Sequence, residues 1–170
     1  LQQSAEVHGF QLGTLEDFEM GGQRVSSTRV REALESGDLG TAGALLGRPY
    51  SMCGRVAHGD KRGRTIGFPT ANIFLHRASV PVSGVFAVEM LGIDEAPIAG
   101  VANVGTRPTV DGSRALLEVH LFDFARDIYG HHVQVRFVKK LREERKFDSF
   151  EHLKQQIQLE SGQARAFFSG

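Results

Sequence analysis

From Pro49 onward the sequence consists of short runs of alternating apolar and polar residues, separated by glycine, proline and aspartate. Runs of about four to eight residues with a period of two are typical of β-strands, and the separating residues are typical of turns. Six such runs with little helix between them favour a closed antiparallel barrel, because closure leaves no strand edge exposed. The candidate strands lie near residues 50–58, 70–75, 84–93, 98–105, 115–124 and 132–138.

Two of these runs indicate which side chains face the interior. Between residues 116 and 124, leucine or valine stands at positions 117, 119 and 121, whereas Glu118 and His120 stand between them. Between residues 132 and 138, valine and phenylalanine alternate with histidine, glutamine and arginine in the same way. Because successive side chains of a strand point to opposite faces, each run predicts one buried face and one outer face.

Two short helices are predicted before the barrel, within residues 28–46. Ser27 or Thr28 is the candidate N-cap of the first helix, and Gly37 is its expected end. Asp38 is the candidate N-cap of the second helix. The chain thus combines a short helical segment with a mainly β domain.

A third helix is predicted after the last strand, where the apolar period changes to that of a helix. Asp148 followed by Glu151 resembles a capping box and marks the expected start. This helix is expected to lie against the barrel through an apolar stripe made of Phe150, Leu153, Ile157, Ala164 and Phe167.

Charge and cysteine content narrow the possible functions. Lys plus Arg and Asp plus Glu both number 20, so no overall field attracts nucleic acid or an anionic membrane. No apolar run approaches the roughly 20 residues that a membrane-spanning helix needs. A single cysteine, Cys53, allows no internal disulfide and is typical of a reducing compartment. We therefore expect a cytoplasmic protein that binds neither nucleic acid nor membrane.

A glycine-rich basic loop precedes the second strand. Gly59, Gly63 and Gly67 allow tight turns and close approach of backbone N–H groups to a ligand, and Lys61 and Arg64 add positive charge. Backbone amides and basic side chains in one concavity form a cradle for phosphates. The alternative is a basic hairpin loop in solvent. The spacing matches neither a Walker A loop nor a Rossmann fingerprint.

Two further features suggest phosphoryl transfer. Thr70 and Asn72 are two residues apart, so on a strand their oxygen atoms share one face and suit Mg²⁺, although both residues are also common at strand ends. Glu118 stands mid-strand opposite an apolar face. Such a carboxylate can accept the proton of an attacking hydroxyl, or it can simply face solvent.

Five motifs occur in order along the chain: GRVAHG at 54–59, GRTIGFPTAN at 63–72, NVGTRPT at 103–109, EVHLFDF at 118–124 and LREERKF at 141–147. Together they resemble the riboflavin kinase domain of bacterial bifunctional riboflavin kinase/FAD synthetases, over about residues 48–168. The resemblance implies a six-stranded antiparallel Greek-key barrel with a C-terminal helix. It also implies transfer of the ATP γ-phosphate to the 5′-hydroxyl of riboflavin, giving FMN, with Mg²⁺ as cofactor.

The resemblance also implies roles for individual residues. Glu118 corresponds to the general base, and Thr70 and Asn72 to the ligands of Mg²⁺ and the ATP phosphates. The segment containing Arg142, Glu144 and Phe147 corresponds to residues near the flavin. The residues that would wrap the nucleotide are Gly59, Lys61, Gly63, Arg64, Gly67, Phe68 and Pro69.

The N-terminal part resembles a different domain. Residues 25–31, VSSTRVR, are similar to the Ser-Ser-Thr-x-x-Arg motif near the end of the adenylyltransferase domain of the same enzymes, with Ser26, Ser27, Thr28 and Arg31 at the motif positions. Residues 1–46 are therefore expected to be the C-terminal remnant of that domain and residues 47–170 the kinase domain. We do not expect this chain alone to make FAD.

Two other classes of function remain as alternatives to an enzyme. One is a flavin- or nucleotide-binding barrel without catalysis, which would not need a base, metal ligands and a phosphate loop together. The other is an oligonucleotide-binding barrel, which would need a basic face with stacking aromatic residues. The sequence has equal numbers of acidic and basic residues and no tryptophan, so the second alternative is disfavoured.

Overall fold

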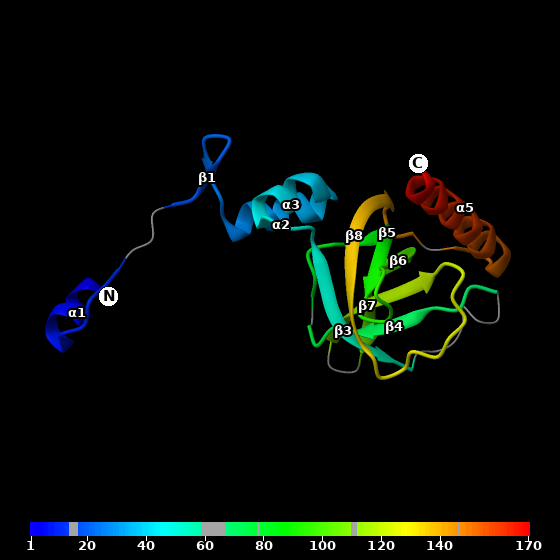
Figure 1. Ribbon diagram of the computed structural model, residues 1–170, viewed down its shortest axis with the longest axis horizontal. Helices are drawn as coiled ribbons and strands as arrows, with labels where there is room; N and C mark the ends of the chain where they lie inside the picture. Colours follow the sequence, from blue (N-terminus) through cyan, green and yellow to red (C-terminus); the bar gives the residue numbers. More distant parts are fainter. Residues whose placement is uncertain (14–16, 59–66, 78, 110–111, 146) are drawn as a thin grey trace.

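A closed barrel of six antiparallel strands forms the body of the computed structural model (Figure 1). The structure describes residues 1–13, 17–58, 67–77, 79–109, 112–145 and 147–170, with the backbone alone at 107–109 and 112–114. The strands are β3 (Ser51–Ala57), β4 (Ala71–Phe74), β5 (Gly84–Leu91), β6 (Ile98–Thr109), β7 (Gly112–Leu121) and β8 (His132–Arg142). The predicted six-stranded barrel is confirmed, and two strands, β6 and β8, are longer than the alternating runs indicated.

The strands follow a Greek-key order. Around the barrel they run β3-β4-β7-β6-β5-β8, and β8 closes the sheet on β3. Strands β5, β6 and β7 form a meander, and β8 returns to lie beside β5, which is the Greek-key arrangement. The longest pairing joins β6 to β7, from Gly100↔Leu121 to Thr109↔Gly112. Closure leaves β7 paired on both sides, with β4 and with β6.

The barrel interior contains the main hydrophobic core. Leu117 and Val119 of β7 are fully buried, as are Val133 and Val135 of β8, so the faces predicted from the alternation are confirmed. The other strands add buried side chains at alternating positions, among them Met52, Val56, Ile73, Phe86, Val88, Met90, Ala102 and Val104. Gly54 allows β3 to approach β4 closely, because a Cβ there would lie 2.4 Å from the carbonyl oxygen of Phe74.

Two short helices precede the barrel, α2 (Ser27–Ser36) and α3 (Leu39–Leu46). The N-cap of α2 is Ser26, whose hydroxyl accepts a hydrogen bond from the Arg29 backbone N–H at 3.3 Å. The expected caps at Ser27 or Thr28 are therefore wrong by a residue or two, because Ser26 is the residue with extended backbone. The predicted end at Gly37 and the predicted cap at Asp38 are confirmed.

The helical pair packs into the barrel core (Figure 1). Leu34 of α2 is 2% exposed and Ala42 of α3 is fully buried. Both belong to the same cluster of contacting side chains as Met52, Val135 and Phe137 of the barrel. The hydrophobic core thus continues across residue 46, where the sequence suggested a domain boundary.

The C-terminal helix, α5 (Phe150–Ser169), covers part of the outer surface of the barrel. Ala164 of α5 packs into a second apolar cluster with Val85, Ala87, Val101 and Phe122, which lie on the outer face of β5 and β6 and just beyond β7. The predicted packing of this helix on the barrel is confirmed, and Figure 1 shows α5 beside the sheet.

Two details of α5 differ from the sequence prediction. Ser149 is the N-cap, because its hydroxyl accepts from the His152 backbone N–H at 3.2 Å, so the capping box at Asp148 is wrong. Two members of the predicted apolar stripe, Phe150 and Phe167, are 64% and 42% exposed. The buried face of the helix runs instead through Glu160, Ser161 and Ala164.

The N-terminal residues contribute three small elements that the sequence did not predict. These are α1 (Gln2–His8), β1 (Glu19–Met20) and β2 (Gln23–Arg24). Figure 1 shows α1 away from the barrel. Across the described parts of the chain, no helix is both long enough and apolar enough to cross a lipid bilayer.

The shared core predicts that α2 unfolds together with the barrel. Leu34→Ala should lower the free energy of unfolding by about 2–5 kcal/mol, because it leaves a cavity in a close-packed cluster. Urea denaturation followed by circular dichroism measures this change. Leu159→Ala is the matched control, since Leu159 is 56% exposed on α5 and should change stability by less than about 0.5 kcal/mol. If Leu34→Ala lowered the free energy of unfolding no more than Leu159→Ala does, α2 would not unfold together with the barrel.

Candidate active site

Three polar side chains form a row across the outer face of the barrel. Glu118 of β7 is paired directly with Asn72 of β4 on one side and with Asn103 of β6 on the other. Residues paired in this way in antiparallel strands share one face, with Cβ atoms about 4.5–5.5 Å apart. The neighbours Leu117 and Val119 point inward, so this row, which we call the polar row, lies outside.

The polar row presents several kinds of hydrogen-bonding group in a small area. Asn72, Asn103 and Glu118 are all half-buried. Each amide offers an N–H₂ donor and a carbonyl acceptor, whereas an ionised carboxylate offers acceptors only. A ligand in contact with the row therefore meets a proton acceptor flanked by neutral donors and neutral oxygens.

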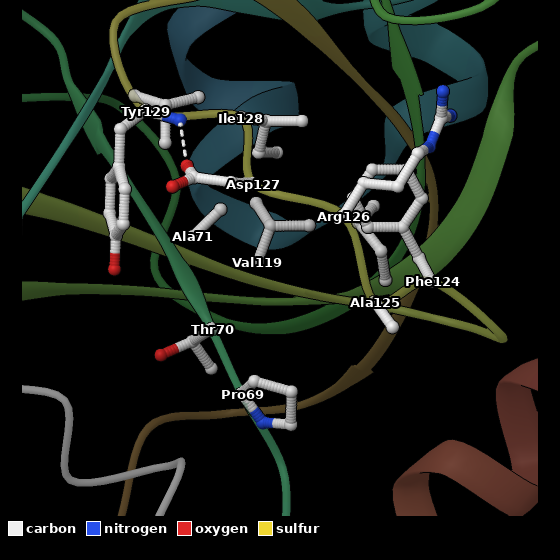
Figure 2. Close-up of a pocket in the computed structure, with 12 residues that line it drawn as sticks. Pro69, Thr70, Ala71, Val119, Phe124, Ala125, Arg126, Asp127, Ile128 and Tyr129 are labelled. Carbon is white, nitrogen blue, oxygen red and sulfur yellow. Dashed lines mark hydrogen bonds between the residues drawn. The ribbon is translucent and has the colours of Figure 1, made fainter.

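A cavity of about 330 Å³ lies beside Thr70 (Figure 2). Pro69, Thr70 and Ala71 form one side of it, and the segment 124–129 that follows β7 forms another. Val119 and Leu121 of β7 also line it, so its lining is largely apolar. Thr70 belongs to the cavity and stands two residues before Asn72, so the segment 69–72 connects the cavity with the polar row.

The rim of the cavity carries an aromatic pair that the sequence did not suggest. The rings of His58 and Tyr129 stack with centroids 3.8 Å apart and an interplanar angle of 33°. The Tyr129 backbone N–H donates to the Asp127 carboxylate at 2.9 Å, as Figure 2 shows. Arg55 donates to the carbonyl oxygen of Gly130 at 2.6 Å. These bonds fix the segment 127–130 and hold Tyr129, which lines the cavity, beside His58.

His120 lies on the same outer face as Glu118 and contacts the segment that leads into β4. Its Nδ1 is 2.9 Å from the carbonyl oxygen of Pro69. Its ring packs edge to face against Phe68, with centroids 5.2 Å apart, and against Phe122 at 6.0 Å. Strand β7 thus carries both Glu118 and His120, and His120 contacts Pro69, the residue before Thr70.

The segment after β8 borders the other end of the polar row. The carboxylate of Glu144 lies over Gly105, where a Cβ would come 2.5 Å from its Oε1. Gly105 is two residues from Asn103 and on the same face of β6. The Arg142 guanidinium is 5.4 Å from the centroid of the Phe147 ring. Of the residues predicted to lie near a flavin, Glu144 thus lies near the Asn103 end of the polar row, and Arg142 and Phe147 contact each other.

Arg142 also has a structural role. Its Nε donates to Glu160 of α5 at 2.5 Å, and Glu160 is 3% exposed. A second ion pair joins α5 to the end of β7, where Arg165 donates two hydrogen bonds to Asp123, at 2.7 and 2.9 Å. Those hydrogen bonds hold the pKa of the Asp123 carboxyl below its usual value. The two pairs fix α5 on the barrel.

The glycine-rich loop is described only in part. Gly59, Lys61, Gly63 and Arg64 lie outside the described residues. Gly67 has a φ of 85°, a left-handed conformation that favours glycine, and Phe68 and Pro69 lead from it to Thr70. Among the residues that the structure describes, no three histidine, cysteine, aspartate or glutamate side chains converge as a metal site. The metal ligands suggested by the sequence are instead the neutral oxygens of Thr70 and Asn72.

The sequence missed two parts of this site. Asn103 entered only as the first residue of the motif at 103–109, and the segment 125–129, which contains Tyr129, was not recognised at all. A weak signal was present, since Asp127 and Gly130 are residue types typical of turns. Nothing local, however, places that turn next to Thr70.

Comparisons with known proteins agree with this geometry. The family model described as "Flavokinase: Riboflavin kinase" matches residues 46–168. The bifunctional riboflavin kinase/FMN adenylyltransferase of Escherichia coli (strain K12) is 53% identical over 168 residues, which cover 99% of this chain and 54% of that protein. The protein of the same name from Haemophilus influenzae is 51% identical over 169 residues, covering 99% and 55%.

Solved structures include a similar chain. A crystal structure described as a macrolide-efflux protein from Streptococcus pneumoniae matches with a TM-score of 0.78 and 39% identity, over 89% of this chain and 50% of that one. The chain spans about half the length of the curated relatives that it matches.

The Arg142–Glu160 pair predicts a measurable loss of stability when it is broken. Glu160→Ala leaves a largely buried guanidinium without its partner and should lower the free energy of unfolding by about 3 kcal/mol. Replacing both residues by methionine should cost less than this single change, because no buried charge is left unpaired. Urea denaturation of the two variants tests the order, with Glu151→Ala at an exposed position of α5 as control. A double variant less stable than Glu160→Ala would contradict it.

Proposed function

The chain belongs to the riboflavin kinase family, and we propose that it transfers the γ-phosphate of ATP to the 5′-hydroxyl of riboflavin, giving FMN and ADP. The observation that carries this proposal is the pairing of Asn72 with Glu118. It brings a candidate metal ligand and a candidate base to neighbouring positions on one accessible face. A barrel that only bound nucleotide or flavin would not need this arrangement.

Glu118 acts as the general base. Phosphoryl transfer to an alcohol needs a group that orients the hydroxyl and accepts its proton. The riboflavin 5′-oxygen attacks the γ-phosphorus, its proton passes to the Glu118 carboxylate, and the bond between the γ-phosphorus and the β,γ-bridging oxygen breaks to release ADP. The half-buried position of Glu118 limits access of bulk water to the carboxylate.

ATP occupies the cavity beside Thr70. Its volume lies at the lower end of the range of about 300–1,000 Å³ that is usual for small-molecule sites, and its lining is largely apolar. The stacked His58 and Tyr129 at the rim suit a planar purine. A nucleotide bound in this way would extend its phosphates along the segment 69–72 toward Glu118, with the glycine-rich loop around them.

Thr70 and Asn72 hold Mg²⁺ together with the phosphates. A hydroxyl and an amide oxygen are hard, neutral ligands, which fit a cation that keeps most of its coordination for water and phosphate oxygens. When bound, Mg²⁺ neutralises charge that develops on the transferred phosphate. The two residues also fix the direction from which the phosphates approach Glu118.

Riboflavin binds on the opposite side of Glu118 from ATP. The polar row runs from Asn72 through Glu118 to Asn103, and the segment carrying Glu144 and Phe147 borders its Asn103 end. Phe147 offers an aromatic surface for the isoalloxazine ring. In this arrangement the riboflavin 5′-hydroxyl and the ATP γ-phosphate meet at Glu118, and an in-line transfer requires the attacking and leaving oxygens to lie on opposite sides of the γ-phosphorus.

The longer protein is proposed to carry out a second reaction, the adenylylation of FMN to FAD. The curated relatives are named for both activities and are about twice as long as this chain. We also propose a cytoplasmic location, because Cys53 is an exposed free thiol and because the reaction consumes ATP.

Removal of the base should abolish most of the turnover. Glu118→Ala is expected to lower kcat by at least about 100-fold with little change in the KM for ATP. A coupled assay of ADP release with riboflavin as acceptor measures both constants. Glu95→Ala, at an exposed position in the turn after β5, is the control and should behave as wild type. Wild-type turnover by the Glu118 variant would remove this residue from its role.

The two amides of the polar row should affect different substrates. Asn72→Ala is expected to raise the KM for MgATP by about 10-fold and to increase the Mg²⁺ concentration needed for half-maximal rate. Asn103→Ala should instead raise the KM for riboflavin, because it lies at the flavin end. The same assay, with each substrate and Mg²⁺ varied in turn, distinguishes the two. An unchanged Mg²⁺ requirement in Asn72→Ala would refute the metal assignment.

A further inference from the structure

We propose that His120 is a positioning residue that fixes Thr70 and the end of the glycine-rich loop relative to Glu118. This inference rests on the proposed kinase function. His120 stands two residues after Glu118 on β7, with its side chain on the same outer face. Its Nδ1 lies 2.9 Å from the carbonyl oxygen of Pro69, which directly precedes Thr70 in the chain.

The direction of this hydrogen bond is fixed by chemistry. The carbonyl oxygen of Pro69 can only accept, so Nδ1 of His120 carries the hydrogen and donates. The bond therefore selects one tautomer of the neutral ring and one orientation of it. It joins two residues that are 51 positions apart in the sequence.

The bond continues the connection of β4 to β7 beyond the end of their ladder. The regular pairing runs from Ile73↔Leu117 to Ala71↔Val119. Continued by one position, the same register places Thr70 opposite His120. Pro69 has no N–H, so its carbonyl oxygen is its one backbone group able to form a hydrogen bond, and the side chain of His120 donates to that oxygen. The segment before β4 is thereby held against the strand that carries the base.

Aromatic packing holds the His120 ring in place. Phe68 meets it edge to face at 74°, with centroids 5.2 Å apart. Phe122 meets it on the same strand face, also at 74°. Phe122 is 8% exposed and belongs to the apolar cluster under α5. The ring is thus supported from the loop side by Phe68 and from the barrel by Phe122.

The hydrogen bond from His120 to Pro69 should affect the binding of ATP rather than that of riboflavin. Pro69 and Thr70 line the cavity assigned to the nucleotide, whereas the flavin end of the polar row lies at Asn103, on the far side of β7. Loss of the bond would let Thr70 shift while Glu118 stays in its ladder. A displacement of about 1 Å at a ligand to the transferred phosphate can cost up to about 100-fold in rate.

Three variants separate the hydrogen bond from the packing of the ring. His120→Phe keeps an aromatic ring and removes the donor. His120→Asn shortens the side chain but keeps an N–H donor the same number of bonds from Cα as Nδ1. His120→Gln places its donor at the position of Nε2 instead. Gln134→Ala, a half-buried polar position on the outer face of β8, is the control for substitution on the barrel surface.

Steady-state kinetics of ADP release, with MgATP and riboflavin varied in turn, test the inference. His120→Phe and His120→Gln should raise the KM for MgATP at least about 10-fold and lower kcat, whereas His120→Asn should stay within about 3-fold of wild type. The riboflavin dissociation constant, measured by quenching of flavin fluorescence, should be unchanged in all three. Thermal unfolding shows whether each variant folds, and His120→Gln replaces His120→Phe if the latter does not.

The outcomes distinguish this inference from the function on which it rests. If the wild-type chain releases no ADP with riboflavin, the kinase function fails whatever His120 does. If the wild type is active, and His120→Phe and His120→Gln both have the wild-type kcat and KM for MgATP, His120 does not position Thr70. A loss in His120→Asn equal to that in His120→Phe would overturn the role of the hydrogen bond. Weaker riboflavin binding with an unchanged KM for MgATP would place His120 on the other substrate.

Discussion

The pairing of β7 with strands on both of its sides is the interaction on which the site depends. Leu117 and Val119 are fully buried in the barrel, and their burial sets the register of the strand. A slip of one residue would turn every side chain of β7 to the other face and bury Glu118 in an apolar interior. The hydrophobic effect on the inside of the barrel therefore fixes the chemistry on its outside. The same ladder places Asn72 of β4 and Asn103 of β6 directly opposite Glu118.

The outer surface of the barrel is divided between structural and chemical roles. Over β5 and β6, α5 buries an apolar cluster around Ala164, and the pairs Arg142–Glu160 and Asp123–Arg165 hold it there. Over β4 and β7 the surface stays accessible and carries polar groups. Helix α5 thus forms a fixed surface next to the accessible polar row. In the proposed function, the nucleotide would reach the polar row from the cavity beside Thr70 and riboflavin from the segment after β8.

The helical pair before the barrel carries two sets of residues with different surroundings. Ser27, Thr28 and Arg31, which match a motif of the adenylyltransferase domain, are exposed on the first half of α2. Leu34, at the other end of the same helix, is buried in the barrel core. One helix of ten residues therefore carries residues that resemble one activity and a side chain that stabilises the domain of another. The helical pair therefore shares the hydrophobic core of the barrel, although all of it but its last residue, Leu46, precedes the residues that match the riboflavin kinase family model.

The sequence by itself determined the strands, the inward and outward faces of β7 and β8, and the helix ends at Gly37 and Asp38. These features depend on periods and caps that span only a few residues, so they can be recognised locally. It also supplied Glu118, Thr70 and Asn72 as candidates through residue type and motif. Only the tertiary structure decided that Asn103 completes the polar row, that Tyr129 meets His58, and that Glu160 rather than Phe150 faces the barrel. Each of these depends on which distant segment lies opposite, and barrel closure sets that partner over separations of tens of residues that no local pattern records.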